Sequence, residues 1–195
     1  MTITTQHPEP TAVGRRAAEI LGLVQGSEEY GRLVESTRMY PDCWATFTGY
    51  PTICQWDLAV DAEPLFVEAM RVLALKAAVY ELSGGDEHLS ELVVPAAVDE
   101  MVHAVLAQFT LVVRMTGRLG LTFVHMTDRE RFGWQRGDYT HVCYLAAGWG
   151  EPPKRYWIDG TETSRRLAIL DEHYSRAGIA DLGRRHDLDF ELAPA

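Results

Sequence analysis

The hydrophobic residues of the chain recur mainly at helical spacing, and no segment shows the strict alternation that is typical of a half-buried strand. Apolar side chains return every three or four positions over residues 13–24, and Gly26 ends this pattern. A second helix is predicted to follow and to run to about Met39. Prolines and glycines interrupt the periodicity over residues 40–57, which we predict to be an aromatic-rich connecting loop.

The two central segments are the most hydrophobic part of the sequence. Residues 63–82 are apolar almost all round, which predicts a helix that is surrounded by neighbours. The glycine-containing stretch 83–86 ends this helix. Pro95 suits the first turn of the next helix, and the apolar pattern extends that helix without a break to about Thr116.

Two further helices are predicted toward the C-terminus. Asp138 can cap one that continues through residue 147. Asp159 and Glu162 have the spacing of a capping box for a helix over residues 160–177. The signals of helix ends therefore agree with the hydrophobic pattern in this part of the chain.

The composition fits a single helical protein. The chain has 195 residues, of which 47% are hydrophobic and 24% are charged, and this length is enough to bury one substantial core. We therefore predict an all-α fold, a single compact multi-helix bundle with aromatic-rich connecting loops. Residues 1–10 are expected to form a flexible tail, residues 11–179 the single helical domain, and residues 180–195 a polar, acidic tail.

The charge of the chain argues against several classes of partner. Asp and Glu number 28 against 18 Lys and Arg, which gives a formal net charge of −10, whereas nucleic-acid binders usually carry a basic surface. Charged residues interrupt the longest apolar runs, and the N-terminus lacks the features of a signal peptide. We therefore expect a cytoplasmic protein with no nucleic-acid partner and no membrane partner.

The three cysteines, Cys43, Cys54 and Cys143, show no Cys-x-x-Cys spacing. Their odd number argues against a framework of disulfides. We expect free thiols in a reducing compartment, and a Cys43–Cys54 bridge or a redox role is the alternative.

The candidate chemistry lies in one apolar helical run and at a histidine beyond it. Asp99 and His103 are four residues apart, so their side chains lie on one face of the predicted helix. His125 follows the glycines that end this run, where a reversal of the chain would bring it back to the same face. A carboxylate and two imidazoles are suited to a divalent metal ion with an open position for water or substrate. Asp128 is a candidate for a fourth ligand.

Two other interpretations of these three residues stay open. In metal-free acid–base catalysis, Asp99 would hold His103 in one tautomer, and His103 would act as general acid or base near neutral pH. In a structural network, the same carboxylate would only orient the imidazole within the core. The spacing of Asp99, His103 and His125 does not choose among the three interpretations.

Further side chains are candidates for binding a substrate. The continuous helix places Arg114 on the side of His103, where it can receive a carboxylate or an oxyanion. Lys76 lies within the most apolar helix, either as a snorkelling or salt-bridged lysine or as a desolvated amine with a depressed pKa. Aromatic residues of the loops either line a pocket or close the helical core.

The other histidines, His141 among them, are expected in tails, loops or solvent-facing helix positions. The substrate-binding candidates are Lys76, Trp44, Tyr50 and Trp134.

Several familiar catalytic motifs are absent from the sequence. It contains no phosphate-binding GxxxxGK[ST] loop, no GxSxG nucleophile elbow, and neither HExxH nor a duplicated Glu-x-x-His pattern. No GxGxxG motif follows a predicted strand. The chemistry must therefore be argued from the Asp and His residues themselves.

Parts of residues 70–158 resemble a known family. The motifs are Leu-Ala-Leu-Lys at 73–76, Val-Pro-Ala-Ala-Val-Asp-Glu-Met-Val-His at 94–103, Gly-Leu-Thr-Phe-Val-His at 120–125 and Gly-Trp-Gly-Glu-Pro-Pro at 148–153. They are similar to motifs of the bacterial relatives of the glycine-rich domain-containing proteins. The resemblance implies a fold and candidate positions at Asp99, His103 and His125, but no reaction, because the function of that family is itself poorly characterised.

The chain departs from the family pattern at three places. The cysteine that such proteins carry near the end of the helix falls here at about Thr116 or Gly117. Val102 stands where such proteins carry a tryptophan before the helical histidine. Met126 follows His125 where they carry a second histidine. The resemblance therefore implies fewer candidate metal ligands in this chain than in its relatives.

Two classes of function follow from the sequence. The first is a small tailoring enzyme that acts on a small molecule or peptide through Asp99, His103 and His125, either with a divalent metal or by acid–base catalysis, with Arg114 as a further catalytic candidate. The alternative is a non-catalytic binding or accessory protein, in which the Asp–His pair is a structural network. A homo-oligomer or a protein partner is compatible with both, and a divalent metal is the cofactor that the residues suggest.

Overall fold

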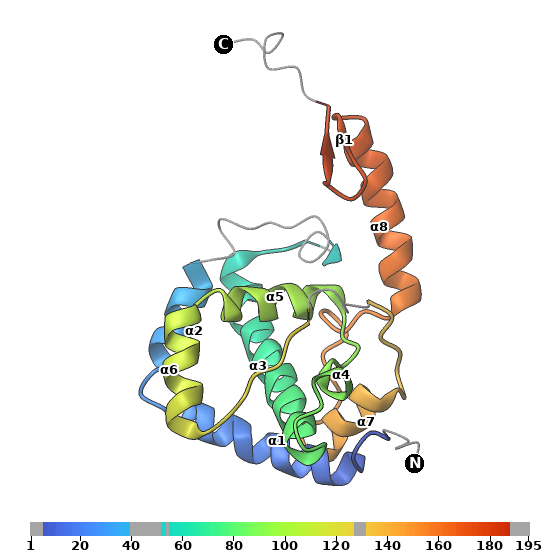
Figure 1. The fold of residues 1–195 in the computed structure, drawn as a ribbon. Helices are drawn as coiled ribbons and strands as arrows, with labels where there is room; N and C mark the ends of the chain where they lie inside the picture. Colours follow the sequence, from blue (N-terminus) through green and yellow to red (C-terminus); the bar gives the residue numbers. More distant parts are fainter. Residues whose placement is uncertain (1–5, 40–51, 54, 127–131, 188–195) are drawn as a thin grey trace.

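The computed structural model describes residues 6–39, 52, 53, 55–126 and 132–187. In this part of the chain, eight helices pack together and a two-stranded hairpin follows them, so the all-α prediction is confirmed (Figure 1). The helices are α1 (Pro10–Gln25), α2 (Tyr30–Met39), α3 (Leu58–Leu82), α4 (Glu87–Ser90), α5 (Ala96–Leu106), α6 (Phe109–Leu119), α7 (Tyr139–Ala146) and α8 (Gly160–Ser175).

Helix α3 forms the centre of the protein, with α1, α2, α4, α5 and α7 packed around it (Figure 1). Over residues 65–79 its apolar residues are buried or half-buried on every side, because each face meets a different neighbour. The helix begins at Leu58, five residues before the predicted start, and the Asp57 carboxylate caps it by accepting a hydrogen bond from the Ala59 amide at 2.9 Å. This all-round burial is what the uniformly apolar sequence predicted.

Helices α1 and α7 approach each other closely at Gly14. A Cβ atom at this position would lie 2.5 Å from the backbone carbon of Ala146 and 2.5 Å from the backbone nitrogen of Ala147. Both neighbours are backbone atoms, so they cannot move aside as a flexible side chain can. Only glycine permits this contact between the two helices.

We expect Gly14→Ala to destabilise the protein by about 2 kcal/mol or more, because the added methyl group must separate α1 from α7. The matched control is Gly22→Ala in the same helix, where nothing lies within 4 Å of the added Cβ. The control should stabilise the protein by up to about 1 kcal/mol through helix propensity. Urea unfolding measures both values, and equal effects of the two substitutions would contradict the close approach.

The predicted continuous helix over residues 95–116 is wrong, because the chain forms two helices there. Helices α5 and α6 meet at an angle of 85°, and Gln108 between them has a non-helical backbone with φ −77° and ψ 44°. The apolar periodicity conceals the bend, because each helix turns its own apolar stripe toward the common core. As a result, Arg114 belongs to a different helix from His103.

No single helix within the described residues is long and apolar enough to cross a membrane. Helices α5 and α6 meet the criteria of length and hydropathy only as a pair, and that pair is bent by 85°.

Helix α8 begins at Gly160 after Asp159, whose carboxylate accepts a hydrogen bond from the Glu162 amide at 2.9 Å, so this half of the predicted capping box is confirmed. The Glu162 carboxylate accepts from Arg165 and Arg166 instead of closing the other half.

Part of the segment that we predict to be a polar, acidic tail, residues 180–195, forms regular structure. Strand β1 (Ile179–Ala180) pairs antiparallel with strand β2 (Arg185–His186), directly after α8. Figure 1 shows α8 and this hairpin projecting from the rest of the protein.

Two buried carboxylates of α3 hold α7 and the segment that follows it. Asp61 accepts hydrogen bonds from Arg155 at 2.6 Å and from the Tyr156 hydroxyl at 2.9 Å. Glu68 accepts hydrogen bonds from the Tyr144 hydroxyl at 2.9 Å and from Trp157 Nε1 at 2.8 Å. These contacts explain how a segment rich in aromatic residues packs against the central helix.

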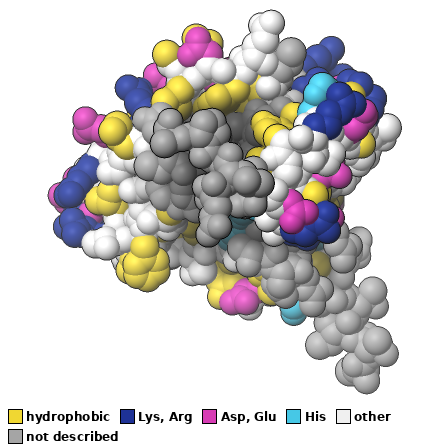
Figure 2. All heavy atoms as spheres, turned by 90° about the horizontal axis from the view of Figure 1, so that it is seen from above, with side chains coloured by type: hydrophobic (Ala, Val, Ile, Leu, Met, Phe, Trp, Pro, Cys, Tyr) yellow, Lys and Arg dark blue, Asp and Glu magenta, His cyan; other side chains and the backbone are white. Residues whose placement is uncertain are grey.

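Charged side chains of both signs lie next to one another on the face seen in Figure 2. Several exposed helices carry ion pairs, such as Arg165 with Glu162 at 2.6 Å. Exposed pairs of this kind contribute little to stability. Acidic and basic side chains are therefore interspersed on this face.

Candidate metal centre

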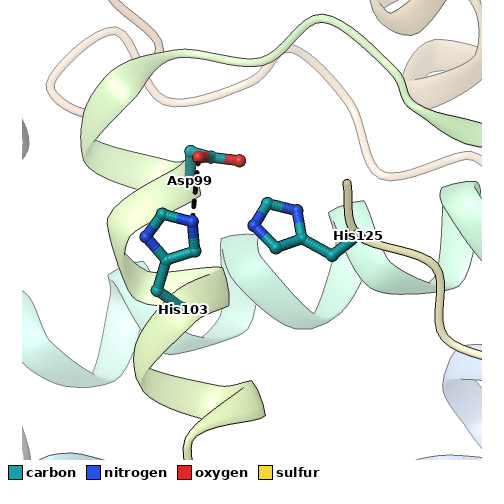
Figure 3. A group of neighbouring side chains, drawn as sticks. All are labelled: Asp99, His103 and His125. Carbon is teal, nitrogen blue, oxygen red and sulfur yellow. Dashed lines mark ion pairs between the residues drawn. The ribbon is translucent and has the colours of Figure 1, made fainter. Parts of the chain in front are cut away.

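Asp99, His103 and His125 lie together at one side of α5 (Figure 3). Each of the three offers one ligand atom, and these atoms all lie within 4.8 Å of one another. Asp99 and His103 come from adjacent turns of α5. Gly120, with a φ of +64°, ends α6, and the chain then returns along residues 121–126 to bring His125 opposite them. The predicted convergence of these side chains is confirmed.

Both ring nitrogens of His103 face a carboxylate. Nε2 lies 3.5 Å from Asp99 Oδ2, and Nδ1 lies 3.4 Å from Glu100 Oε2. The two acidic side chains are almost fully buried, whereas the His103 side chain is 19% exposed. His103 is therefore the member of the group that solvent reaches most readily.

Lys76 and Glu91 form a buried ion pair behind His125. Lys76 Nζ lies 2.6 Å from Glu91 Oε1 and 3.1 Å from His125 Nδ1, and the Lys76 side chain is 0% exposed. The other Glu91 oxygen accepts a hydrogen bond from the Met126 amide at 2.8 Å. Lys76 therefore takes the salt-bridged form that the sequence left open, and it supports His125 from within the core.

The environment of His125 keeps its imidazole neutral. Burial, and next the charges of Lys76 and His103, lower the pKa of His125 to about 3. A neutral imidazole is the form that binds a metal ion. His125 is therefore not an imidazolium at neutral pH.

This pKa predicts how stability depends on pH in protein treated with a chelator. The unfolded His125 binds a proton below its ordinary pKa of 6.5, while the folded one stays neutral down to about 3. The free energy of unfolding should therefore fall as the pH falls through this range, by about 1.4 kcal/mol per pH unit from this residue. Urea unfolding at pH 7, 6 and 5 should show a smaller slope for His125→Gln, and equal slopes would contradict the assignment.

The buried groups around His103 and His125 carry an excess of negative charge. Asp99, Glu100 and Glu91 are three buried carboxylates against the single ammonium of Lys76, a formal charge of −2 while both imidazoles are neutral. An excess charge in a low-dielectric interior is costly. A divalent cation cancels it fully, and a proton on His103 cancels half of it.

The other predicted site residues lie elsewhere. Arg114 is exposed on α6, beyond the 85° bend, so the premise that placed it beside His103 is wrong. Trp134 is buried and makes edge-to-face contacts with Trp157 and His141 at ring-centroid distances of 5.2 and 6.0 Å. Several candidates lie outside the described residues, namely Trp44, Tyr50, Asp128, Cys43 and Cys54.

Sequence reasoning missed two parts of this region. Glu91 reaches His125 across 34 residues of sequence, from a loop before α5 that shows no motif. His141 was expected to face solvent, but it is buried in α7. Cys143, in contrast, is a free and buried thiol, as predicted.

Comparison of the chain with models of protein families, with curated proteins and with solved structures found no match. The resemblance of residues 70–158 to the glycine-rich domain-containing proteins therefore stays a prediction.

Proposed function

We propose that Asp99, His103 and His125 bind a divalent transition metal, and that the protein uses this metal for chemistry on a small molecule or peptide. The observation that carries the proposal is the convergence of three ligand atoms within 4.8 Å. Two imidazoles and one carboxylate are a common ligand set for Fe²⁺ and Zn²⁺ enzymes, and three protein ligands leave positions for water and substrate.

Glu100 supports this proposal from behind His103. A histidine that binds metal through Nε2 usually donates its Nδ1 hydrogen to a carboxylate or carbonyl group. Glu100 Oε2 lies 3.4 Å from Nδ1, on the side of the ring opposite Asp99. With a metal ion on Nε2, Glu100 would accept the Nδ1 hydrogen of His103. The metal would act as a Lewis acid and lower the pKa of a bound water.

A second candidate, the non-catalytic core network, is favoured by the contact between Lys76 and His125. An ammonium group only donates, so Lys76 donates to His125 Nδ1 at 3.1 Å and leaves the ring proton on Nε2, toward Asp99. Such a network would not need a metal ion. Coordination at Nε2 displaces this proton, so the metal-binding function requires that metal uptake releases protons.

Metal content by mass spectrometry tests the proposal on full-length protein purified without an affinity tag. We expect about one Zn²⁺ per chain after loading and removal of excess metal. The double variant His103→Ala/His125→Ala should lose it, while His88→Ala, on the exposed face of α4, should retain it. Folded wild-type protein that binds no metal, or a double variant that binds as much as wild type, would contradict the proposal.

An open coordination position separates a catalytic metal from a structural one. Co²⁺ in place of Zn²⁺ gives a visible spectrum that reports its ligands, and azide should change this spectrum by entering the open position. The same spectrum with and without azide would indicate a closed site. The metal would then have only a structural role.

A further inference from the structure

Lys76 presents a positive charge to the ring nitrogen of His125 that a metal ion in the candidate centre would not bind. The His125 ring points toward Asp99 and His103, and the ring centroids of the two histidines lie 4.7 Å apart (Figure 3). At the other ring nitrogen, Lys76 Nζ lies 3.1 Å from Nδ1. The Lys76 side chain is fully buried in α3, so solvent screens its charge very little.

This contact opposes the form of His125 that binds a metal ion through Nε2. An ammonium group only donates, so Lys76 requires a lone pair on Nδ1. Coordination through Nε2 requires the reverse, a hydrogen on Nδ1 that is directed at an acceptor. With a metal ion bound, the hydrogens of Lys76 and of Nδ1 would face each other. The ammonium charge would also repel the cation.

Glu91 offers an acceptor for the Nδ1 hydrogen. Its Oε1 lies 3.8 Å from His125 Nδ1 and 2.6 Å from Lys76 Nζ, so one oxygen lies near both groups. Its Oε2 accepts from the Met126 amide at 2.8 Å, in a bond that does not involve Lys76. The Met126 amide therefore still holds the Glu91 carboxylate next to His125 when the ammonium moves away or is replaced. A carboxylate behind a metal-bound histidine is the usual arrangement in metal sites.

We propose that Lys76 regulates the metal centre by lowering its affinity, because it competes for Nδ1 of His125, and that Glu91 accepts the Nδ1 hydrogen when a metal ion is bound. This inference rests on the proposed metal function and adds its regulation. Metal binding must displace Lys76 from the ring, so the occupancy of the centre follows the concentration of free metal. The two partners of one ion pair thus act on the metal in opposite directions.

A purely structural ion pair leads to a different expectation. Removing either partner of a buried pair leaves the charge of the other unpaired, which destabilises the fold. Substitutions of Lys76 and of Glu91 would then both weaken zinc binding, if they change it at all. The sign of the effect at Lys76 therefore separates the two roles.

The tautomer of His125 tests the inference in the wild-type protein. Long-range proton–nitrogen NMR spectra show which ring nitrogen carries the hydrogen. With a chelator present we expect it on Nε2, and after addition of Zn²⁺ we expect it on Nδ1. A hydrogen on Nδ1 in the metal-free protein would overturn the inference, whether or not the protein binds zinc.

Lys76→Met removes the ammonium and should tighten zinc binding about tenfold or more, as measured by competition with a coloured chelator. Lys76→Gln serves as a second variant in case Lys76→Met does not fold, because its amide can donate to Glu91 and accept from Nδ1. It should also bind zinc more tightly than wild type. The matched control is Lys154→Met at the other lysine of the chain, which is exposed and should leave the zinc affinity unchanged.

The role of Glu91 is tested in the Lys76→Met background, where adding Glu91→Gln should weaken zinc binding about tenfold. An unchanged affinity would show that Glu91 is not the acceptor. If wild type binds zinc and neither Lys76 variant binds it more tightly, the inference is wrong while the metal function stands. If wild type and both Lys76 variants bind no zinc, both are wrong.

Discussion

Asp99→Asn is expected to weaken zinc binding by about 100-fold or more, because loss of even an outer-shell partner of a metal ligand typically costs 10–100-fold. The amide has nearly the same shape as the carboxylate but carries no charge. Asp99 lies in the first turns of α5, so helix formation does not require its ionised form. Competition with a coloured zinc chelator at neutral pH measures the affinity.

The zinc affinities of two further variants serve as references for that of Asp99→Asn. Glu100→Gln removes the charge next to His103 Nδ1, and we expect a loss of about tenfold, as for an outer-shell partner. Asp181→Asn lies in the exposed turn of the hairpin and should leave the zinc affinity unchanged. If Asp99→Asn binds zinc as tightly as Asp181→Asn does, the metal is bound by other residues.

Glu68→Ala is expected to destabilise the protein by about 3–5 kcal/mol, the range for breaking a buried charge network. Glu68 Oε1 lies 2.6 Å from Arg71, and Oε2 accepts hydrogen bonds from the Tyr144 hydroxyl and from Trp157 Nε1. Tyr144 and Trp157 are buried, so the substitution leaves their donors without an acceptor. Urea unfolding measures the loss.

The control for this experiment is Glu19→Ala on the surface of α1. Glu19 also pairs with an arginine, Arg16 at 3.1 Å, but both side chains are accessible to solvent. We expect a change within about 0.5 kcal/mol. A loss at Glu68 no larger than the loss at Glu19 would show that the network around Tyr144 and Trp157 does not hold the segment after α7.

The helices whose ends carry chemical signals could be predicted from the sequence. Helix α8 begins after the N-cap Asp159, and α7 begins after Asp138, whose carboxylate accepts from the His141 amide at 2.9 Å. The bend at Gln108 carries no such signal, because apolar residues continue on both sides of it. The strands after α8 are two residues each and too short to show a periodicity.

In the candidate site, contacts between residues that are close in the sequence could be predicted, and contacts between distant segments could not. Asp99 and His103 could be paired from the sequence because helical geometry fixes residues four apart. The position of Lys76 could not be derived, since its ion pair with Glu91 and its contact with His125 depend on how three separate segments pack. Arg114 does not lie beside His103 as expected, because the chain bends by 85° between α5 and α6 instead of forming one helix.

X-ray diffraction from zinc-soaked crystals, measured at the zinc absorption edge, tests the metal site most directly. The proposal predicts an anomalous peak at about 2.0–2.2 Å from an Asp99 oxygen, His103 Nε2 and His125 Nε2. A well-ordered site without an anomalous peak, with His125 Nε2 still directed at Asp99, would contradict it. The group would then be the metal-free network in which Lys76 fixes the tautomer of His125.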